Sequence, residues 1–525
     1  LTSTLSAEQK DSSIAPLWRL VLTRTGQTTV TYDEDRIISI DHLEEPYHSQ
    51  ADVVLNNSDL NITTDFKGYQ GVISYGMTTS AGAERSACAP LFVTGQQNHS
   101  SQGVLTVTLT LKGLPDLLAE DKANIKTILE SSDTQTVKTI ITSIVAATHA
   151  SFNHCVAYTA TYDSEDNLID TVKPADSFDI QLNDTRLEAI QRLLFFTRSV
   201  MRVEANGALH FLAPTIDGDT WLAGTAYTVN EYAEPTVVNN TFAFRCSTAG
   251  TSHATTEPVW PTVAAGTVTD GTVVWTAVGF DYEYRLAVAD QHELFAKSTR
   301  NRLLMPNYIR VGNHPDHVDN FSGTAEDTDS SDITNMEKRE HYYMRPASNA
   351  EATSIAKAIL QTYRMAQQRG SAFVPLNVGQ EVHDYVKLTD SRQDDVRIGN
   401  IGAIQRNAGQ GRWEMQFAFG DTKLGGFLGL TPPILGLDAG GVAAPSGAAQ
   451  GVNAATQAVL VDLVRQINAA LATMQGRLNQ LQAALNVQRN ISSGALQNVD
   501  ALEQVVSNLR VTERLRIPVG TDKFD

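Results

Sequence analysis

The chain has 525 residues, of which 42% are hydrophobic, so it is long enough to form several domains with buried cores. Its 59 acidic side chains outnumber its 40 basic ones, and the net charge of −19 argues against a surface that grips nucleic acid by its phosphates. Cys88, Cys155 and Cys246 have neither disulfide-framework nor metal-ligand spacing. We interpret them as small buried apolar residues.

Membrane insertion and export are not predicted by the sequence. No apolar run is long enough to cross a bilayer, and the amino-terminal LTSTLSAEQKDSS lacks both a basic region and a hydrophobic core. We therefore expect a soluble chain without an export signal.

Residues 1–120 have the texture of a β-barrel or sandwich. Short alternating runs are separated by turn clusters such as TRTGQ and FKGYQG. In the clearest run, VLTVTLTL, one face of the predicted strand holds Leu105, Val107, Leu109 and Leu111.

Residues 121–218 predict an α+β unit. Thr185 and Glu188 form the sequence of a capping box, and apolar residues then recur at helical spacing. Asn206-Gly207 predicts a two-residue hairpin between the alternating runs that follow.

The same unit resumes at residues 280–345, where YEYRLAVAD and LLMPNYIRVGN are strand-like. The intervening residues 219–279 therefore form an inserted module. Within it, Asp270-Gly271 predicts a tight hairpin, because both residues tolerate positive φ.

The module is rich in aromatic residues, which allow two interpretations. In a unit of about sixty residues the rings would be needed as the core, because little other apolar area is available. Alternatively, they would stack on sugar rings at a host surface. The candidate glycan contacts are Trp221, Tyr227, Trp260 and Trp275.

Residues 346–424 predict a second β-barrel-like domain preceded by a helix. Ile355, Ile359 and Tyr363 share one helical face, and the final run RWEMQFAFG alternates cleanly. A Gly/Ala/Pro-rich stretch at 425–452 is too broken for a helix and is predicted to be a linker.

Residues 453–525 predict a coiled coil followed by a carboxyl-terminal tail. Apolar residues are spaced alternately four and three apart, and a helix of about fifty residues with such a narrow seam requires partner helices. The seam favours three strands, since Leu at most a positions with mixed Leu, Ile and Met at d is not the dimer pattern, and the e and g positions lack charge pairs. The predicted trimer core is Leu460, Val464, Ile467, Leu471, Met474, Leu478, Leu481, Leu485, Val499, Leu502, Val506 and Leu509.

Catalytic and metal-binding patterns are weak. His314 and His317 would supply two metal ligands, but no third stands at a suitable spacing, and a polar loop is the other interpretation. The acidic run from Glu326 to Asp332 lacks the Gly and terminal Glu of a calcium loop and is interpreted as a solvated loop. Adjacent carboxylates such as Glu44 and Glu45 would point to opposite faces of a strand, so they do not mark a cleft. No enzyme, metal or cofactor is predicted.

Several stretches in a fixed order resemble the tail hub proteins of tailed bacteriophages, also called baseplate hub or tail tip proteins. They are ADVVLNNSD, FKGYQGVISYG and GQQNHSSQG in the first region, FDIQLNDTRLEAIQRLL and RVEANGALHFLAP in the second, and the segment from NVGQEVHDYV to RWEMQFAFG in the third. They span most of residues 17–420.

The resemblance implies a mainly β chain with α+β parts, in which tail-tube-like β-barrel domains form a pseudo-sixfold ring in a homotrimer. It implies a structural virion protein at the tail tip, assembled in the host cytoplasm, which joins the hexameric tail tube or a distal tail protein to tip or fibre proteins. The tape measure protein is a further implied partner, and DNA would pass through without specific binding. The other function considered is a trimeric host-surface adhesin that binds a glycan through the inserted module.

Overall fold

The structure is a computed structural model that describes residues 1–420, apart from residues 12–13, 102–103, 131, 164–166, 217, 238–241, 286–293, 295, 302–305, 314–318, 394 and 410. The predicted linker at 425–452, the predicted coiled coil at 453–525 with all of its core residues, and His314 and His317 lie outside the described residues. In the described part, no helix is both long and apolar enough to cross a membrane.

The amino-terminal part of the chain forms antiparallel strands in the order β2-β1-β5-β7-β8-β4-β3, with β6 paired to β5. Helix α1 (Ser3–Glu8) buries Leu5 against their core. The strands are β1 (Pro16–Thr23), β2 (Val30–Asp33), β3 (Ile37–Glu45), β4 (His48–Asn56), β5 (Gln70–Thr79), β6 (Gly82–Ala87), β7 (Leu91–Ser101) and β8 (Val104–Gly113).

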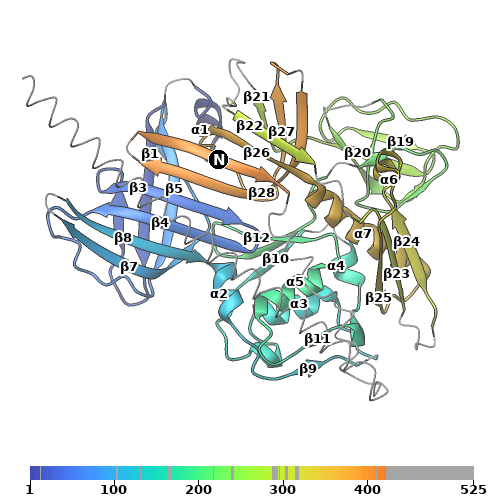
Figure 1. The fold of residues 1–525 in the computed structure, drawn as a ribbon, viewed down its shortest axis with the longest axis horizontal. Coiled ribbons are helices and arrows are strands. Elements are labelled where there is room, and N and C mark those ends of the chain that lie inside the picture. Colours follow the sequence, from blue (N-terminus) through green and yellow to red (C-terminus); the bar gives the residue numbers. More distant parts are fainter. Residues whose placement is uncertain are drawn as a thin grey trace, which may run out of the picture. The chain divides into compact units, whose positions relative to one another are not determined.

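The sheet continues without a break into strands from the other end of the described chain (Figure 1). Strand β3 pairs with β28 from Ile404 opposite Glu44 to Gly409 opposite Ser39, and the order then runs β28-β29-β26-β22. Strand β27 pairs with β28 and with β21. The strands are β21 (Tyr282–Arg285), β22 (Ala296–Asn301), β26 (Gln368–Pro375), β27 (Tyr385–Asp390), β28 (Asp395–Gly409) and β29 (Arg412–Phe419).

One apolar core serves both halves of this sheet. Alternation along β8 buries Val107, Leu109 and Leu111, and alternation along β29 buries Met415 and Phe417 in the same cluster. Both predicted strand faces are confirmed.

A second core lies among helices and short strands (Figure 1). The elements around it are α2 (Leu114–Glu120), β9 (Thr127–Ile128), α3 (Val137–Val145), η1 (Ala150–Phe152), β10 (Ala160–Tyr162), α4 (Asn167–Thr171), η2 (Ala175–Ser177), β11 (Asp179–Ile180), α5 (Arg186–Leu194), β12 (Val200–Val203) and β13 (Leu209–Leu212). The same core includes residues of β23 (Tyr308–Asn313), β24 (Ser322–Glu326), β25 (Arg339–Met344) and α7 (Asn349–Gln367).

Local signals in this part are confirmed, with one correction. The Thr185 hydroxyl accepts from the Glu188 amide, and the Glu188 carboxylate accepts in return from the Thr185 amide, so α5 begins with the predicted capping box. The predicted hairpin joins β12 and β13, but its turn is longer than two residues. Glu204 N donates to Ala208 O, so Ala205, Asn206 and Gly207 all lie in the turn.

The acidic run near residue 327 is also corrected, from a solvated loop to a helix start. Asp327 is buried and caps α6 (Thr328–Thr334) by accepting from Ser330 N at 3.0 Å. Its other oxygen accepts from Arg364 Nε at 3.0 Å. A cap and an ion pair therefore use this carboxylate.

The inserted module is a separate five-stranded sheet in the order β14-β16-β17-β20-β19, with β15 paired to β18. The predicted hairpin is present, but its turn is shifted by one residue. Asp270 ends β19 and pairs with Val273, so Gly271 and Thr272 form the turn, and of the predicted pair only Gly271, with a φ of +63°, lies in the positive-φ region. The strands are β14 (Asp219–Thr220), β15 (Ala226–Tyr227), β16 (Tyr232–Glu234), β17 (Ala243–Thr248), β18 (Gly250–Thr251), β19 (Thr267–Asp270) and β20 (Val273–Val278).

Candidate functional site

The joint between β3 and β28 contains a buried ion pair. Glu44 on β3 and Arg406 on β28 lie on adjacent strands, and Arg406 NH1 donates to Glu44 Oε2 at 2.5 Å. The Arg406 side chain is 2% exposed, and its NH2 donates to the backbone oxygen of Gln380. The guanidinium therefore links β28, β3 and the loop that precedes β27.

The electrostatics of this pair follow from its burial and its geometry. Burial alone would raise the pKa of Glu44, but the adjacent Arg406 charge outweighs it and the pKa is lowered. Burial would likewise lower the pKa of Arg406, whereas Glu44 holds it above its ordinary value. Both groups stay charged, so neither can be removed without leaving a buried charge without its partner.

A cavity of about 220 Å³ adjoins the ion pair. Glu44, Glu45, Cys88, Arg202, Glu381 and Arg406 line it. The expectation that the adjacent carboxylates Glu44 and Glu45 do not mark a cleft was therefore wrong. The cavity forms because three distant segments converge at the joint, which the local sequence of β3 could not indicate.

One group of potential metal ligands lies beside the cavity. Ligand atoms of His42, Glu44 and Cys88 all lie within 4.8 Å of one another. His42 Nε2 is 3.4 Å from Glu44 Oε1 without a hydrogen bond, while its Nδ1 is 3.3 Å from Tyr75 Oη. The donor types would suit a divalent transition metal.

Two features of this group oppose metal binding. Burial raises the pKa of the Cys88 thiol to about 12, and a thiol must lose its proton to become a good ligand. The Arg406 guanidinium already binds Glu44, and its positive charge would repel a second cation. The arrangement therefore favours a structural polar network.

A second ionic cluster lies across the same cavity. Arg202 on β12 contacts Glu204 at 2.9 Å, Glu381 at 3.0 Å and Asp384 at 3.6 Å. Asp384 also accepts from Glu381 N and from Gln380 Nε2. Burial raises the pKa of Asp384 to about 7. This cluster fixes the β12–β13 hairpin to the loop before β27.

The four aromatic residues predicted as glycan contacts come together in the inserted module. Trp275 is 0% exposed, Trp221 is 6% exposed and Tyr227 is 7% exposed, while Trp260 is partly buried. The rings of Tyr227 and Trp275 lie 4.8 Å apart, and those of Trp260 and Trp275 lie 5.7 Å apart. Three of the four rings therefore contact the module's core rather than solvent.

The module also contains a buried carboxylate that the sequence did not single out. Asp270 Oδ2 accepts from the indole nitrogens of Trp221 at 2.7 Å and Trp275 at 3.1 Å, and its Oδ1 accepts from His253 N at 2.8 Å. Asp270 thus fixes two rings of the core as well as ending β19. Its Asp-Gly context indicates a turn and carries no signal for this second role.

The module is anchored to the body of the chain by its own polar and apolar residues. Lys357 on α7 contacts Glu231 at 2.9 Å, and Arg364 on the same helix forms an ion pair with Asp219. Tyr232 and Tyr385 share a small apolar cluster. The module is therefore held on one side by α7 and β27.

Among the described residues, Cys155 and His154 form a potential nucleophile and base pair. Cys155 Sγ lies 3.5 Å from His154 Nε2. Burial, together with Asp121, raises the pKa of the Cys155 thiol, so this contact does not activate it. The geometry at Cys155 gives no support for nucleophilic catalysis.

Comparisons with known proteins give structural likenesses only. No protein-family model and no curated protein sequence matches the chain. Its structure is similar to the tail protein from Neisseria meningitidis MC58, with a TM-score of 0.47 and 9% identity, covering 78% of this chain and 97% of that chain.

Two further likenesses are of the same kind. The 43 kDa tail protein of prophage MuSo2 from Shewanella oneidensis has a TM-score of 0.44 and 9% identity, covering 76% of this chain and 97% of that chain. The prophage tail protein gp18 from Listeria monocytogenes EGD-e has a TM-score of 0.43 and 10% identity, covering 79% and 99%. All three solved structures are described as tail proteins, and the last two come from prophages.

Proposed function

We propose that this chain is a structural virion protein, a homotrimeric tail hub that joins the hexameric tail tube to trimeric tip or fibre components and surrounds the DNA exit channel. The observation that carries the proposal is the pairing of β3 with β28, which joins an amino-terminal and a carboxyl-terminal half into one continuous sheet. Three chains would then present six half-sheets, which matches the symmetry of a hexameric tube.

The ionic joint supports this role, because a ring under load needs rigid connections between its parts. Arg406 and Arg202 hold the two halves of the sheet and the β12–β13 hairpin at one junction through Glu44 and Glu381. Charge supports it too. With a net charge of −19 on each chain, a trimer carries −57 in total. Acidic channel walls would offer exiting DNA no basic groups to bind its phosphates, so the DNA would not stick.

The remaining parts of the proposal rest on the sequence. We propose that residues 453–525 form the trimeric coiled coil and that residues 425–452 link it to the hub. The hub would contact the tail tube or a distal tail protein on one side and tip or fibre proteins on the other, with the tape measure protein as a further partner. No catalytic step is proposed for the described residues.

Sedimentation of the purified chain, followed by symmetry-resolved imaging of the particle, tests the proposal. The expected result is a three-chain mass and a ring whose channel wall contains six half-sheets, two from each chain. A monomer at all concentrations, or a ring with a basic channel lining, would contradict it. The variant Arg406→Met provides a matched test of the joint, because it should weaken the ring without altering any exposed charge.

A second candidate function is a host-surface adhesin that binds a glycan through the inserted module. The observation that favours it is a group of exposed apolar residues near the half-buried Trp260, in which Val237 is 82%, Val259 is 90% and Val263 is 64% exposed. Of the four predicted contact rings, Trp260 is the one this proposal retains. Glycan-array binding that is lost in Trp260→Ala but kept in Arg412→Gln, an exposed position outside the module, would support it.

A further inference from the structure

The three-stranded sheet β24-β23-β25 has one covered face and one open face. Helix α7 packs on the covered face, where Ile309 and Val311 of β23 are fully buried. Because side chains alternate along a strand, the residues between them point the other way. The strand register arranges the open face in three rows: Glu326, Tyr308 and Arg339, then Thr324, Arg310 and His341, then Ser322, Gly312 and Tyr343.

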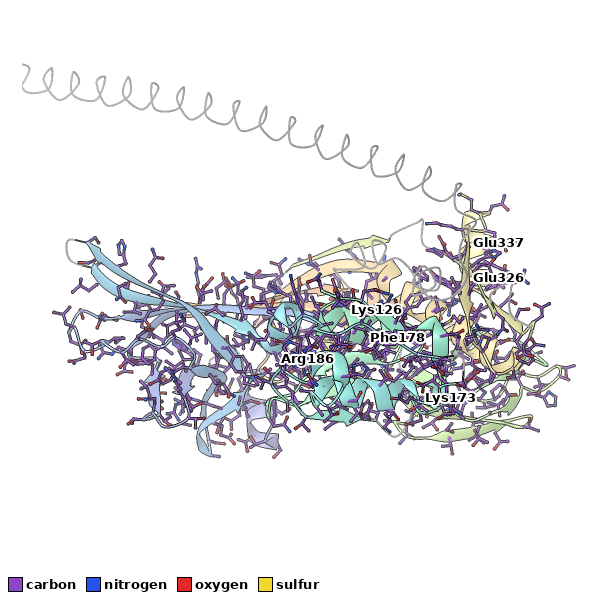
Figure 2. The ribbon with its side chains drawn as sticks, turned by 90° about the horizontal axis from the view of Figure 1, so that it is seen from below. Lys126, Lys173, Phe178, Arg186, Glu326 and Glu337 are labelled. Atoms are coloured by element: carbon purple, nitrogen blue, oxygen red, sulfur yellow. The ribbon has the colours of Figure 1, made fainter. Side chains whose placement is uncertain are left out.

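Of the two arginines on this face, Arg339 has an ion-pair partner and Arg310 has none among the described residues. Arg339 pairs with Glu337 at 2.9 Å and lies over the Tyr308 ring at 4.6 Å. Figure 2 labels Glu326 at the end of β24 and Glu337 in the segment before β25. In the middle row, Arg310 and His341 are exposed and have no hydrogen-bond or ion-pair partner among the described residues. The centre of the face therefore presents a free guanidinium in a chain whose net charge is −19.

The third row provides a ring beside a gap. Tyr343 is 39% exposed, and its cross-strand neighbour Gly312 has no side chain. A Cβ at Gly312 would lie 3.3 Å from Phe321 O and 3.4 Å from Ser322 Cβ, so a side chain there would crowd the β24 side of the row. A hollow of about 510 Å³ adjoins this part of the face. Its lining includes Arg310, Gly312, Ser322, His341 and Tyr343 of the open face, together with Asp319 and the end of β23 at Asn313. Small-molecule sites have this range of volumes, about 300–1,000 Å³.

We propose that this open face binds a carboxylate-bearing sugar. The Arg310 fork would hold the carboxylate through two parallel hydrogen bonds, with His341 beside it. The sugar ring would lie against Tyr343 over the gap at Gly312. The hydroxyl of Ser322 and the carboxylate of Asp319 would bind sugar hydroxyls. This site goes beyond the proposed hub function and does not rest on it, and it lies outside the inserted module.

The same observations favour a sugar over single-stranded nucleic acid. Nucleic-acid grooves combine stacking rings with a continuous basic track along the phosphates. Among the described residues of this face, Arg310 is the one arginine or lysine without an ion-pair partner, and Asp319, Glu326 and Glu337 border the face. A ligand with one carboxylate per ring suits this balance of charge better than a polyphosphate does.

Binding of the full chain to carboxylate-bearing oligosaccharides tests the proposal. The probes are galacturonate, glucuronate-containing and sialic acid oligomers, measured by calorimetry against the methyl-esterified form of each. We expect at least one acidic oligomer to bind, its methyl ester to bind at least about tenfold more weakly, and added salt to weaken binding. Arg310→Gln and Tyr343→Ala should each weaken binding at least about tenfold.

Controls keep each result decisive. Arg412→Gln removes an exposed arginine at the start of β29 and should leave binding unchanged. Unchanged melting temperatures of Arg310→Gln and Tyr343→Ala would show that loss of binding is not loss of folding. The proposal is overturned if no acidic oligomer binds, if methyl esters bind equally, or if a deoxythymidine oligomer binds more tightly at this face. A change in the chain's sedimenting mass in Arg310→Gln would also overturn it, because the face would then be an interface between copies.

Discussion

At the scale of single residues, Arg406 is a buried charge that depends on partners from distant parts of the chain. Its guanidinium is buried where the two halves of the sheet join, contacts Glu44 and the Gln380 carbonyl, and lies 5.9 Å from the Tyr75 ring centre. A buried charge is tolerated only while its partners are in place. The residue therefore makes folding of the joint depend on both halves of the sheet at once.

Arg406→Met tests that dependence. The substitution leaves the Glu44 carboxylate buried without its partner, so the free energy of unfolding should fall by about 3–5 kcal/mol. The double variant Glu44→Leu with Arg406→Met should recover most of the loss, because no lone charge remains. Urea unfolding followed by circular dichroism measures both, with the exposed Arg412→Met expected to change stability by less than about 0.5 kcal/mol. Equal effects of Arg406→Met and Arg412→Met would contradict the account.

Asp384 gives the joint a pH dependence. Its pKa is raised by burial to about 7, so the folded state holds this proton more strongly than the unfolded state does. The stability it contributes is present below about pH 4 and is lost as the pH rises through about 7. Asp384→Asn removes this titration, so the stability of the variant relative to the wild type should increase between about pH 4 and about pH 7.

Two buried histidines have the opposite effect on the pH dependence of stability. The stability of Asp384→Asn must therefore be compared with that of the wild type at each pH. Burial lowers the pKa of His42 to about 4 and that of His383 to about 3. Stability from these groups is present above their ordinary pKa and is lost as the pH falls through those values. Thermal unfolding of Asp384→Asn and wild type across the same pH series cancels the histidine contribution. A difference that does not vary with pH would show that Asp384 does not titrate in this range.

At the scale of elements, the sequence predicted the features that depend on neighbouring residues, such as helix caps, turns and strand alternation. The capping box at Thr185, the hairpin at Gly271 and the alternation along β8 depend on residues within a few positions of one another, and all three are present. Glu44 and Arg406 are 362 positions apart, so their pairing follows from the β3–β28 register and from nothing near either residue. The second role of Asp270 likewise depends on Trp221, 49 positions away.

The inserted module offers a test of whether its rings form a core. Trp275→Ala would empty a fully buried site and remove one donor to Asp270, so it should cost about 3–5 kcal/mol. Trp260→Ala should cost clearly less, because this ring is only partly buried and its indole nitrogen bonds Glu257 at the surface. Hydrogen exchange in β17 and β20 reports on the module alone. Equal deprotection by the two substitutions would mean that Trp260 belongs to the core as fully as Trp275 does.

At the scale of the whole molecule, the body combines two kinds of connection. Strands β3 and β28 join distant parts of the chain by backbone hydrogen bonds, whereas the module is held by side chains such as Lys357 and Arg364. Backbone pairing resists single substitutions, while ion pairs at a partly exposed surface contribute little each. We therefore expect substitutions at the contacts of the module to be tolerated better than substitutions that disrupt the sheet.

Association of three chains is the last prediction, and it rests on the apolar seam at residues 453–510. Leu471 and Leu478 are predicted a positions, where each side chain would be buried against its symmetry mates. Aspartate at both positions would place six carboxylates on the axis of a trimer, which the buried seam cannot accommodate. The double variant should therefore dissociate toward monomer on dilution, while the wild type sediments as three chains. The matched control replaces Thr473 and Gln480 with aspartate. These residues stand at outer c positions of the same two heptads, so the mass should stay unchanged.

The isolated segment 453–510 should also sediment as three chains. A monomeric segment would mean that the helix packs on another protein and does not by itself associate the chains.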